Sequence, residues 1–447
     1  MAGDMEADEG STAEAAYRSA LGAIRARSGY ARGFISDQSA GDDAARLGLR
    51  RTAAVLDRLG RPQERYGIVH VAGSKGKGST CALLASVLQA AGHRVGLHTS
   101  PHLHRFTERI AVDGRPVEEA TFATLTGRAV AAAEAVESAE PHLGRVTAFE
   151  LSVAMALDHF AAVGCDLAVI EVGLGGALDA TNVVDPLAAV ITALDLEHTA
   201  VLGPTLEAIA AQKAGIIKPG RPVVVAPQPA GALTVVLEAA ERAGSPALVC
   251  GRDWWVSGSW RAFAAEGPWG THADLRLGLV GPHQVENAGA AIAASWLVDA
   301  VGFPVPAPAV RAGLAATRWP GRFEVVPTRA VARCVDGAGT EPGAGPGLDS
   351  DPSGGHVPVA PADAAAGPPA APAGTREGGV GAPAAGGYAI LRPDDRYPTV
   401  ILDGAHTPTS AAALAATVAA EVPGRRAVLV LGVLADRDPA ALARALA

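Results

Sequence analysis

Cysteine is scarce in this chain. Its four cysteines are scattered with no paired spacing, at Cys81, Cys165, Cys250 and Cys334. This excludes a disulfide framework and a zinc site built from cysteines, and it fits a reducing compartment. Basic residues are outnumbered as well, with 37 Lys and Arg against 46 Asp and Glu and a net charge of −9. That balance argues against nucleic acid as the main partner.

Long apolar runs are also missing. A membrane-spanning helix needs about 20 consecutive apolar residues, and charged residues, glycine or proline interrupt the alanine-rich segments of this chain. Residues 1–10 are acidic, which is unlike a secretory signal or a transit peptide. We therefore expect no membrane partner, a cytoplasmic location and a disordered lead over residues 1–15.

What is present is a regular alternation of two patterns. The chain has 447 residues, enough for two or three domains. Short apolar runs predict strands at 68–71, 95–97, 167–171, 189–192 and 223–226. Alanine-rich runs predict helices at 80–91, 118–139, 148–162, 206–214 and 288–300. This alternation predicts an α/β fold, with a parallel sheet covered by helices on both faces.

The composition changes in the last third of the chain. Residues 327–387 are dominated by Ala, Gly and Pro, and such a segment buries too little apolar surface to offset its ordering entropy. We expect a disordered insertion there. Regular pattern returns with strands at 388–391, 399–402 and 427–431 and a helix at 410–420. The predicted division is therefore a first domain at 16–318 and a second at 319–447.

The strongest chemical signal is a glycine-rich turn between a predicted strand and a predicted helix, Gly73-Ser74-Lys75-Gly76-Lys77-Gly78-Ser79-Thr80. Glycines let backbone N–H groups converge on an anion, and a helix N-terminus favours negative charge. A lysine adds a positive charge, and a following hydroxyl can reach Mg²⁺. The spacing departs from the commonest phosphate loop, and a basic surface turn is the alternative. The flanking strand and helix favour the phosphate site, so we expect the chain to bind a nucleoside triphosphate.

Three more residues are candidates for chemistry. Glu171 ends an apolar strand, at the edge of a parallel sheet where ligands bind, and its carboxylate suits Mg²⁺; the alternative is a solvated acid. His198 follows another strand and is either a metal ligand, a phosphate partner or a structural histidine. Lys213 lies among small and apolar residues, which is unusual for a solvated lysine, although a surface lysine ahead of Gly215 is the alternative.

In this order, these segments resemble the folylpolyglutamate synthase/dihydrofolate synthase family of the Mur ligase superfamily. The resemblance runs from about Leu47 to the C-terminus, apart from the insertion. Upstream it rests on the blocks at 71–80, 99–103, 108–110, 147–150, 171–182 and 212–218. Downstream it rests on the blocks at 281–288, 319–324, 403–406 and 432–438.

The resemblance implies a P-loop ATPase-like domain followed by a Rossmann-like glutamate-ligase domain. It implies an enzyme that joins L-glutamate to the carboxyl group of a folate or dihydropteroate through an acyl phosphate. ATP and Mg²⁺ would be required, and ADP and phosphate released. The implied partners are these small molecules, and a monomer is expected.

The resemblance also implies roles for individual residues. Those implied to contact ATP are Gly73, Ser74, Lys75, Gly76, Lys77, Gly78, Ser79, Thr80, Asn287, Arg322, Asp403 and His406. The implied Mg²⁺ ligands are Ser79, Glu171 and His198. The implied pterin-substrate residues are Ser100, Pro101, Thr147, Ala148, Ala177, Leu178 and Asp179. The implied catalytic residues are Lys77, Glu171, His198 and Lys213, and Lys213 matches a lysine that the family carbamylates.

The sequence departs from the family pattern in several places. Lys75 stands where Asn is usual, Ala177 where Arg is usual, Glu197 where Asp is usual and Thr407 where Asn is usual. The loss of the arginine removes a cation from the pterin-carboxylate side. The chain stops at Ala447, where family members continue, so we expect an incomplete second domain.

Two other functions are compatible with these observations. One is a remnant that binds nucleotide and folate without turnover, because its second domain is incomplete. The other is a sister Mur ligase that acts on another carboxylate, which the block Thr99-Ser100-Pro101-His102 disfavours.

Overall fold

The computed structural model describes residues 2–27, 41–326, 400–423, 428, 430 and 439–446. The chain divides into two compact units, Met1–Trp319 and Pro320–Ala447. The division falls next to the boundary expected after residue 318. The insertion expected at 327–387 and the block at 432–438 lie outside the described residues, as does most of the strand expected at 427–431.

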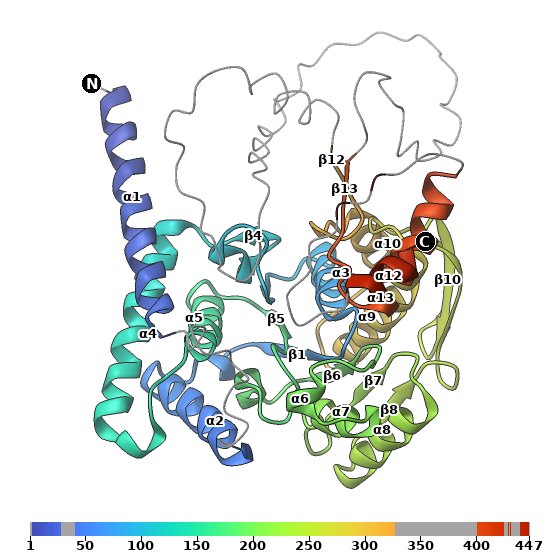
Figure 1. Ribbon diagram of the computed structural model, residues 1–447, viewed down its shortest axis with the longest axis horizontal. Coiled ribbons are helices and arrows are strands. Elements are labelled where there is room, and N and C mark those ends of the chain that lie inside the picture. The colour runs from blue at the N-terminus through green and yellow to red at the C-terminus, as the bar shows by residue number, and fades with distance from the viewer. Residues whose placement is uncertain are drawn as a thin grey trace. The chain divides into compact units, whose positions relative to one another are not determined.

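The first unit is built on an eight-stranded sheet with the order β4-β3-β2-β5-β1-β6-β7-β8 (Figure 1). Its strands are β1 Gly67–Ala72, β2 Val95–His98, β3 Ile110–Val112, β4 Arg115–Pro116, β5 Leu167–Glu171, β6 Ala188–Ile191, β7 Val223–Val225 and β8 Ala247–Val249. Six neighbouring strands are parallel, namely β2, β5, β1, β6, β7 and β8. At one edge of the sheet, β3 pairs antiparallel with both β2 and β4. The predicted α/β class is confirmed.

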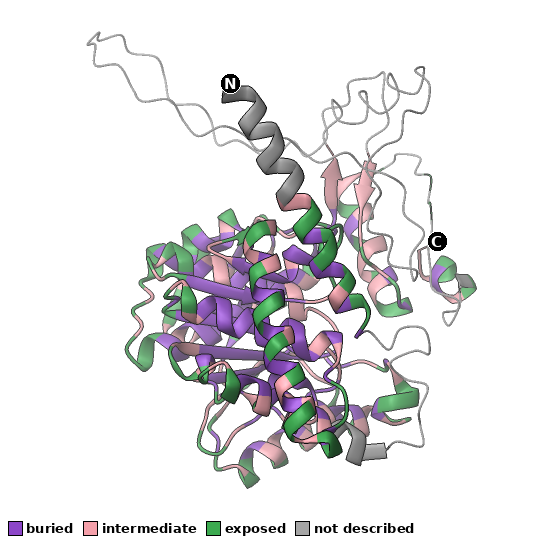
Figure 2. Cartoon of the chain, turned by 90° about the vertical axis from the view of Figure 1, so that its left-hand side faces the viewer, coloured by how far each residue is buried: buried purple, intermediate pink, exposed green. Residues whose placement is uncertain are grey.

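Helices cover both faces of this sheet (Figures 1 and 2). The first-unit helices are α1 Ala2–Arg25, α2 Gly41–Arg58, α3 Lys77–Ala90, α4 Glu119–Ala139, α5 Ala148–Ala162, α6 Thr199–Leu202, α7 Leu206–Ala214, α8 Ala230–Arg242, α9 Pro282–Ala300 and α10 Ala307–Ala316. Val69 and Val71 of β1 pack in a core with α3, α9 and α10, whereas Ile68 packs in a core with α1, α2, α4 and α5. Both faces are therefore buried, which explains the continuous apolar runs of the central strands.

The predicted elements agree closely with the observed ones, with two exceptions. α5 and α7 have the predicted bounds, but α9 begins at Pro282, ahead of the predicted start at residue 288. Its first turns carry polar side chains, so the apolar pattern alone misses them. The second concerns residues 2–15, where a disordered lead was expected and which form part of α1. The spacing of the buried Tyr17, Leu21 and Ile24 is helical, and it anchors α1 on the core around α4 and α5.

The helices α2, α6, α8 and α10 and the strands β3, β4 and β8 were not predicted. Three strands of a separate sheet were not predicted either. They are β9 Trp255–Ser259, β10 Ala262–Gly267 and β11 Gly270–Leu275, which form an antiparallel sheet of their own. Their burial does not alternate regularly, so they lack the pattern that marks a half-buried strand. In the second unit, β12 Glu324–Val326 pairs antiparallel with β13 Val400–Leu402, and the helices are α12 Pro408–Glu421 and α13 Pro439–Leu446.

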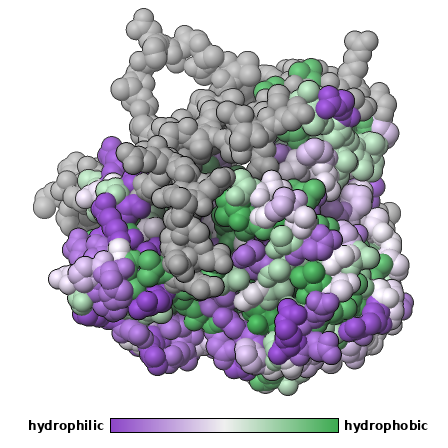
Figure 3. Space-filling view, turned by 60° about the horizontal axis from the view of Figure 1, so that its bottom comes forward, coloured by the Kyte–Doolittle hydropathy of each residue, from purple (hydrophilic) through white to green (hydrophobic). Residues whose placement is uncertain are grey.

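The surface is mixed in character. On the face shown in Figure 3, hydrophilic and hydrophobic side chains are interspersed. The exposed large apolar residues of the described part include Leu103, Leu196, Val201, Trp255 and Val301. None of the described helices combines the length and apolar character needed to span a membrane.

A buried ion pair fixes the start of α5. Arg51 of α2 donates from Nε and Nη2 to the carboxylate of Glu150 at 3.0 and 2.8 Å, and from Nη1 to Leu143 O at 2.7 Å. Glu150 also accepts from the backbone N–H of Thr147, which completes the capping box of α5. The pair therefore joins α2 to the helix N-terminus that carries Thr147 and Ala148.

We expect Arg51→Leu to reduce the free energy of unfolding by about 3 kcal/mol, because Glu150 would keep a buried charge without its partner. Arg58→Leu is the matched control, since Arg58 is exposed on the same helix, and it should unfold like the wild type. Urea unfolding followed by circular dichroism measures the difference. Equal stability of the two variants would show that the pair does not hold α2 in place.

Candidate functional site

The glycine-rich loop, residues 73–80, follows β1 and runs into α3. A Cβ on Gly73 would lie 1.8 Å from Thr192 Oγ1, and a Cβ on Gly76 would lie 2.2 Å from Asn287 Oδ1. Gly76 also has a φ of 83° and caps the N-terminus of α3. The loop is thus enclosed between the end of β6 and α9 with no room for side chains at these two positions, so glycine is required there.

The backbone N–H groups of the loop fall into two sets. Those of Ser74 and Lys75 donate to Ala193 O at 2.9 and 3.0 Å, and Ser74 Oγ donates to Asp195 O. They brace the loop and are not free for a ligand. The first bond of α3 runs from Thr80 N to Gly76 O, so the N–H groups at the start of the helix have no intrahelical acceptor. The N–H groups that remain for an anion at this helix N-terminus are therefore those of residues 77–79.

Three lysines lie together beside this helix N-terminus. Lys77 Nζ and Lys213 Nζ both donate to Gly73 O at 2.8 Å. Lys213 Nζ also donates to Glu197 Oε1 at 3.0 Å, and Lys75 Nζ lies 3.5 Å from Glu197 Oε2. One carboxylate therefore serves two ammonium groups, and a third lies within the same hydrogen-bonded cluster.

The scarcity of lysine makes this cluster stand out. The whole sequence has only four lysines, Lys75, Lys77, Lys213 and Lys218, and three of them are here. Elsewhere, apart from Lys218, the chain uses arginine in place of lysine. Arginine keeps its proton, whereas lysine offers a compact ammonium that loses its proton when it is buried. Lysine count is thus a signal in the sequence that points to this site.

The electrostatics of the cluster follow from burial. Lys213 is only 2% exposed, and burial together with the charge of Lys77 lowers its pKa to about 8. Burial also lowers the pKa of Lys75. Burial opposes ionisation of Glu197, but the charges of Lys77 and Lys213 outweigh it and hold the pKa of that carboxyl below its ordinary value. The surface-lysine alternative for Lys213 is therefore wrong.

The three residues expected to bind Mg²⁺ are placed by different elements. Glu171 ends β5 beside Val71 of β1, is 5% exposed, and accepts a hydrogen bond from Ser100 N at 3.0 Å, so the solvated-acid alternative is wrong. Ser79 lies in the first turn of α3, where Gln284 Nε2 approaches its hydroxyl at 3.4 Å. His198 precedes α6 with a φ of 48°, a strained value for histidine, between the exposed Leu196 and Val201.

Two of these three residues carry donors that suit a hard cation. A serine hydroxyl and a carboxylate supply oxygen ligands, which Mg²⁺ prefers. Among the described residues no group of three or more His, Cys, Asp and Glu could hold a metal by itself. The expected set has two such residues and a hydroxyl, so any ion here would need further oxygens from a ligand or from water.

Several residues of the site were missed from the sequence. Asn287 donates to Gln284 Oε1 at 2.9 Å, so Gln284 links it to Ser79. The indole of Trp319 lies against Gly78, 3.2 Å from where a Cβ would be. Gln228 bonds the backbone at both Thr192 and Leu194 and so fixes the strand end that supports Gly73. Gln284 and Trp319 lie in blocks of the family resemblance, but Gln228 has no local signal.

The residues expected to bind a pterin lie at the same edge of the sheet. Ser100 follows β2 and the stretch 177–179 follows β5, whose C-terminal ends share an edge with that of β1. Thr147 caps α5. Ala148 is the next residue, at the start of α5. The ring of Phe149 fills the space over Gly173, so the start of α5 packs against residues 173–176, the glycine loop that follows Glu171.

The second unit brings its own candidates together. Asp403 accepts from the N–H groups of Phe323 and Ala405, both at 2.8 Å. The guanidinium of Arg322 lies against Gly404, and His406 Nδ1 is 2.8 Å from Gly404 O. Arg322, Asp403 and His406 thus surround the loop that follows β13.

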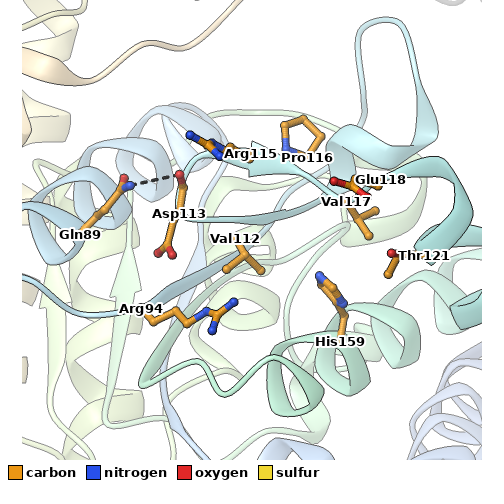
Figure 4. Close-up of a pocket in the computed structure, with 10 residues that line it drawn as sticks. All are labelled: Gln89, Arg94, Val112, Asp113, Arg115, Pro116, Val117, Glu118, Thr121 and His159. Carbon is orange, nitrogen blue, oxygen red and sulfur yellow. Dashed lines mark hydrogen bonds between the residues drawn. The ribbon is translucent and has the colours of Figure 1, made fainter. Parts of the chain in front are cut away.

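A pocket of about 490 Å³ lies elsewhere on the first unit (Figure 4). Arg94, Asp113, Arg115, Glu118 and His159 are among its lining residues. Arg94 precedes β2 and Asp113 follows the antiparallel β3, so the pocket lies at the sheet edge opposite to residues 73–80. No predicted site residue lines it.

Family models match both units. The model of the Mur ligase middle domain matches residues 71–295, and that of the Mur ligase glutamate ligase domain matches residues 391–447. The dihydrofolate synthase/folylpolyglutamate synthase of Bacillus subtilis strain 168 is 39% identical over 288 residues, 62% of this chain and 66% of that protein. The chain thus spans just under two thirds of that relative. The Mycobacterium tuberculosis protein of the same name is 31% identical over 411 residues, 87% of this chain and 70% of that protein.

Solved structures of folylpolyglutamate synthases are also similar to this chain. An FPGS–AMPPCP–folate complex has a TM-score of 0.72 at 30% identity and covers 96% of this chain and 86% of its own. The Mycobacterium tuberculosis folylpolyglutamate synthase complexed with ADP has a TM-score of 0.70 at 30% identity and covers 90% of this chain and 76% of its own.

We expect Gly76→Ala to weaken ADP binding at least tenfold and to lower the melting temperature, because the new Cβ would collide with Asn287. Gly92→Ala is the matched control. Gly92 follows the same helix with a φ of 95° but has no atom within 4 Å of its Cβ position, so it carries only the backbone strain, about 1 kcal/mol. Calorimetric titration with ADP measures both. Equal ADP affinity in the two variants would contradict the enclosed loop.

Proposed function

This chain belongs to the folylpolyglutamate synthase/dihydrofolate synthase family of Mur ligases, and on that premise we propose that it joins L-glutamate to the carboxyl group of a folate or dihydropteroate. ATP is the energy source, and ADP and phosphate are the by-products. The observation that carries the proposal is the group of three lysines around Gly73 at the N-terminus of α3. The lysines provide positive charge where the phosphates of a nucleotide would lie, and the first turn of α3 provides backbone N–H groups.

The reaction needs two steps, because a carboxylate is a poor acyl donor. A carboxylate oxygen of the pterin substrate attacks the γ-phosphorus of ATP, and ADP leaves. The amine of glutamate then attacks the acyl carbon, loses a proton and expels phosphate. Phosphoryl transfer depends mainly on positioning and charge neutralisation. The concentration of ammonium groups beside the loop matches that requirement.

Each lysine has a proposed part. Lys77, which bonds Gly73 O in the structure, turns to the transferred phosphoryl group when ATP is bound. Ser74 and Lys75 brace the loop through Ala193, and the N–H groups of residues 77–79 bind phosphate oxygens. Ser79, Glu171 and His198 would hold Mg²⁺, which supplies charge neutralisation at the phosphates.

The remaining candidates divide by substrate. We assign Ser100, Pro101, Thr147, Ala148, Ala177, Leu178 and Asp179 to the pterin substrate. We assign Asn287, Arg322, Asp403 and His406 to ATP. A pterin ring presents N–H and amino donors, which the carboxylate of Asp179 can accept.

We expect Lys77→Ala to abolish glutamate-dependent ADP release, because the developing phosphoryl charge would lose its ammonium. Lys218→Ala is the matched control, since Lys218 lies outside the loop and bonds Asn182 O. A coupled ADP assay with glutamate and either folate or dihydropteroate measures both variants. Near-normal turnover of Lys77→Ala would overturn the loop assignment. A wild type that binds ADP and folate without turnover would favour the remnant instead.

Lys213 is proposed to act as a carbamate. Only a neutral amine reacts with CO₂, and with a pKa of about 8 roughly a quarter of the Lys213 side chains are neutral at pH 7.5, against about 0.1% of ordinary lysines. Carbamylation would replace an ammonium by an anion within reach of Lys75 and Lys77. Glu197, which now accepts from Lys213, would then repel it and pair with Lys75 alone.

We expect ¹³C-bicarbonate to give one carbamate NMR signal, which grows as the pH rises through 8 at fixed CO₂ because the reactive neutral amine becomes the main form there. Lys213→Ala should lack the signal and be nearly inactive, with partial rescue by acetate, and exclusion of CO₂ should lower wild-type activity. Lys218→Ala should keep the signal. A fully active Lys213→Ala enzyme would return Lys213 to a structural role.

A further inference from the structure

A fully buried chain of hydrogen bonds links β1 to the loop after β5. His70 Nε2 lies 2.8 Å from Thr181 Oγ1, and Thr181 Oγ1 donates to Asp179 Oδ1 at 2.5 Å. Asp179 also accepts from Thr181 N at 3.0 Å and, through Oδ2, from Leu174 N at 2.8 Å. His70 and Thr181 have no exposed surface, and Asp179 is 7% exposed. The chain therefore ends on the glycine loop, residues 173–176.

The donors in this chain follow when Asp179 is treated as ionised. Backbone N–H groups donate to both of its oxygens, and a carboxylate can only accept. The hydroxyl proton of Thr181 must then point to Asp179. Its oxygen therefore accepts from His70, which places the imidazole proton on Nε2. His70 Nδ1 has no hydrogen-bond partner among the residues that the structure describes.

The pKa of His70 agrees with this direction. Burial and the charge of Lys218 lower the pKa of His70 to about 3, so the ring is neutral. Burial raises the pKa of Asp179, and the bonds from Thr181 and Leu174 oppose that rise. Each lost donor would therefore leave the buried carboxylate less stable in its charged form.

The position of the chain connects two parts of the proposed site. His70 is on β1, three residues before Gly73, and its register partner on β5 is Ile170, which precedes Glu171. Because in-register neighbours of parallel strands share a face, His70 lies under the loop that carries Asp179. The same strand thus supports the phosphate loop with its end and the glycine loop with this side chain.

We propose that His70 and Thr181 are positioning residues, which hold the Asp179 carboxylate and the glycine loop 173–176 in the arrangement that binds the pterin ring. This rests on the proposed function, because it takes Asp179 as a pterin contact. Neither residue needs to touch the substrate. Their part is to supply a donor to a buried carboxylate that has no ammonium or guanidinium bonded to it in the described part of the chain.

Thr181→Val is the decisive variant, because valine keeps the shape and removes the hydroxyl. We expect it to raise the KM for folate and the dissociation constant of folate about tenfold, the effect of one hydrogen bond to a charged group, while the ADP affinity is unchanged. Thr181→Ser restores the donor and should behave like the wild type. His70→Gln keeps an N–H near the Nε2 position and should be milder than His70→Leu.

A second measurement separates this inference from the proposed function. Amide hydrogen exchange at Leu174 should be faster in Thr181→Val than in Thr181→Ser, whether or not folate is a substrate. Faster exchange together with a wild type that does not bind folate would show that the hydrogen-bond chain holds the loop and that the proposed function fails. Unchanged exchange at Leu174, unchanged folate affinity in Thr181→Val, or an equal loss of ADP affinity would each overturn the positioning role.

Discussion

The carboxylate of Glu197 balances two lysines at the phosphate loop, and the site depends on that balance. Lys213 is almost completely buried, and a buried ammonium without a partner is strongly unfavourable. Glu197 Oε1 accepts from it while Oε2 faces Lys75. In the sequence, Lys75 and Glu197 are two separate departures from the family pattern. In the structure these two residues form one ion pair. The positive charge of Lys75 is therefore offset by the carboxylate of Glu197.

The parallel sheet brings these groups to one place. β2, β5, β1 and β6 are neighbours in that order, and their C-terminal ends face the same edge. Ser100, Gly73 and His198 each follow one of those strands, and Glu171 is the last residue of β5. The loops themselves have little freedom, because glycine approaches Thr192 and Asn287 too closely for any side chain. A preorganised edge of this kind suits a reaction that needs positioning more than covalent help.

Other side chains fix the positions of the loops and helix starts at this edge of the sheet. Gln228 fixes the end of β6, Gln284 joins Asn287 to Ser79, and the Arg51–Glu150 pair fixes the start of α5. The His70–Thr181–Asp179 chain does the same for the glycine loop after Glu171. Each of these contacts joins residues that are distant in the sequence, apart from the short links at Thr181 and Gln284. The proposed binding residues are therefore held in place by side chains from other elements.

The sequence alone determined the α/β class, most of the central strands and helices, and the presence of a glycine-rich loop between a strand and a helix, because each depends on a local pattern. The bounds of α5 and α7 follow from their caps and apolar spacing, and the loop follows from glycines between a strand and a helix. Only the tertiary structure decided that Ser74 and Lys75 use their N–H groups within the protein, that Lys213 is buried against Glu197, and that α1 is a helix packed on the core. Those outcomes depend on partners 16 to 140 positions away, and no local pattern records which distant backbone oxygen or carboxylate will lie within hydrogen-bond distance once the sheet has formed.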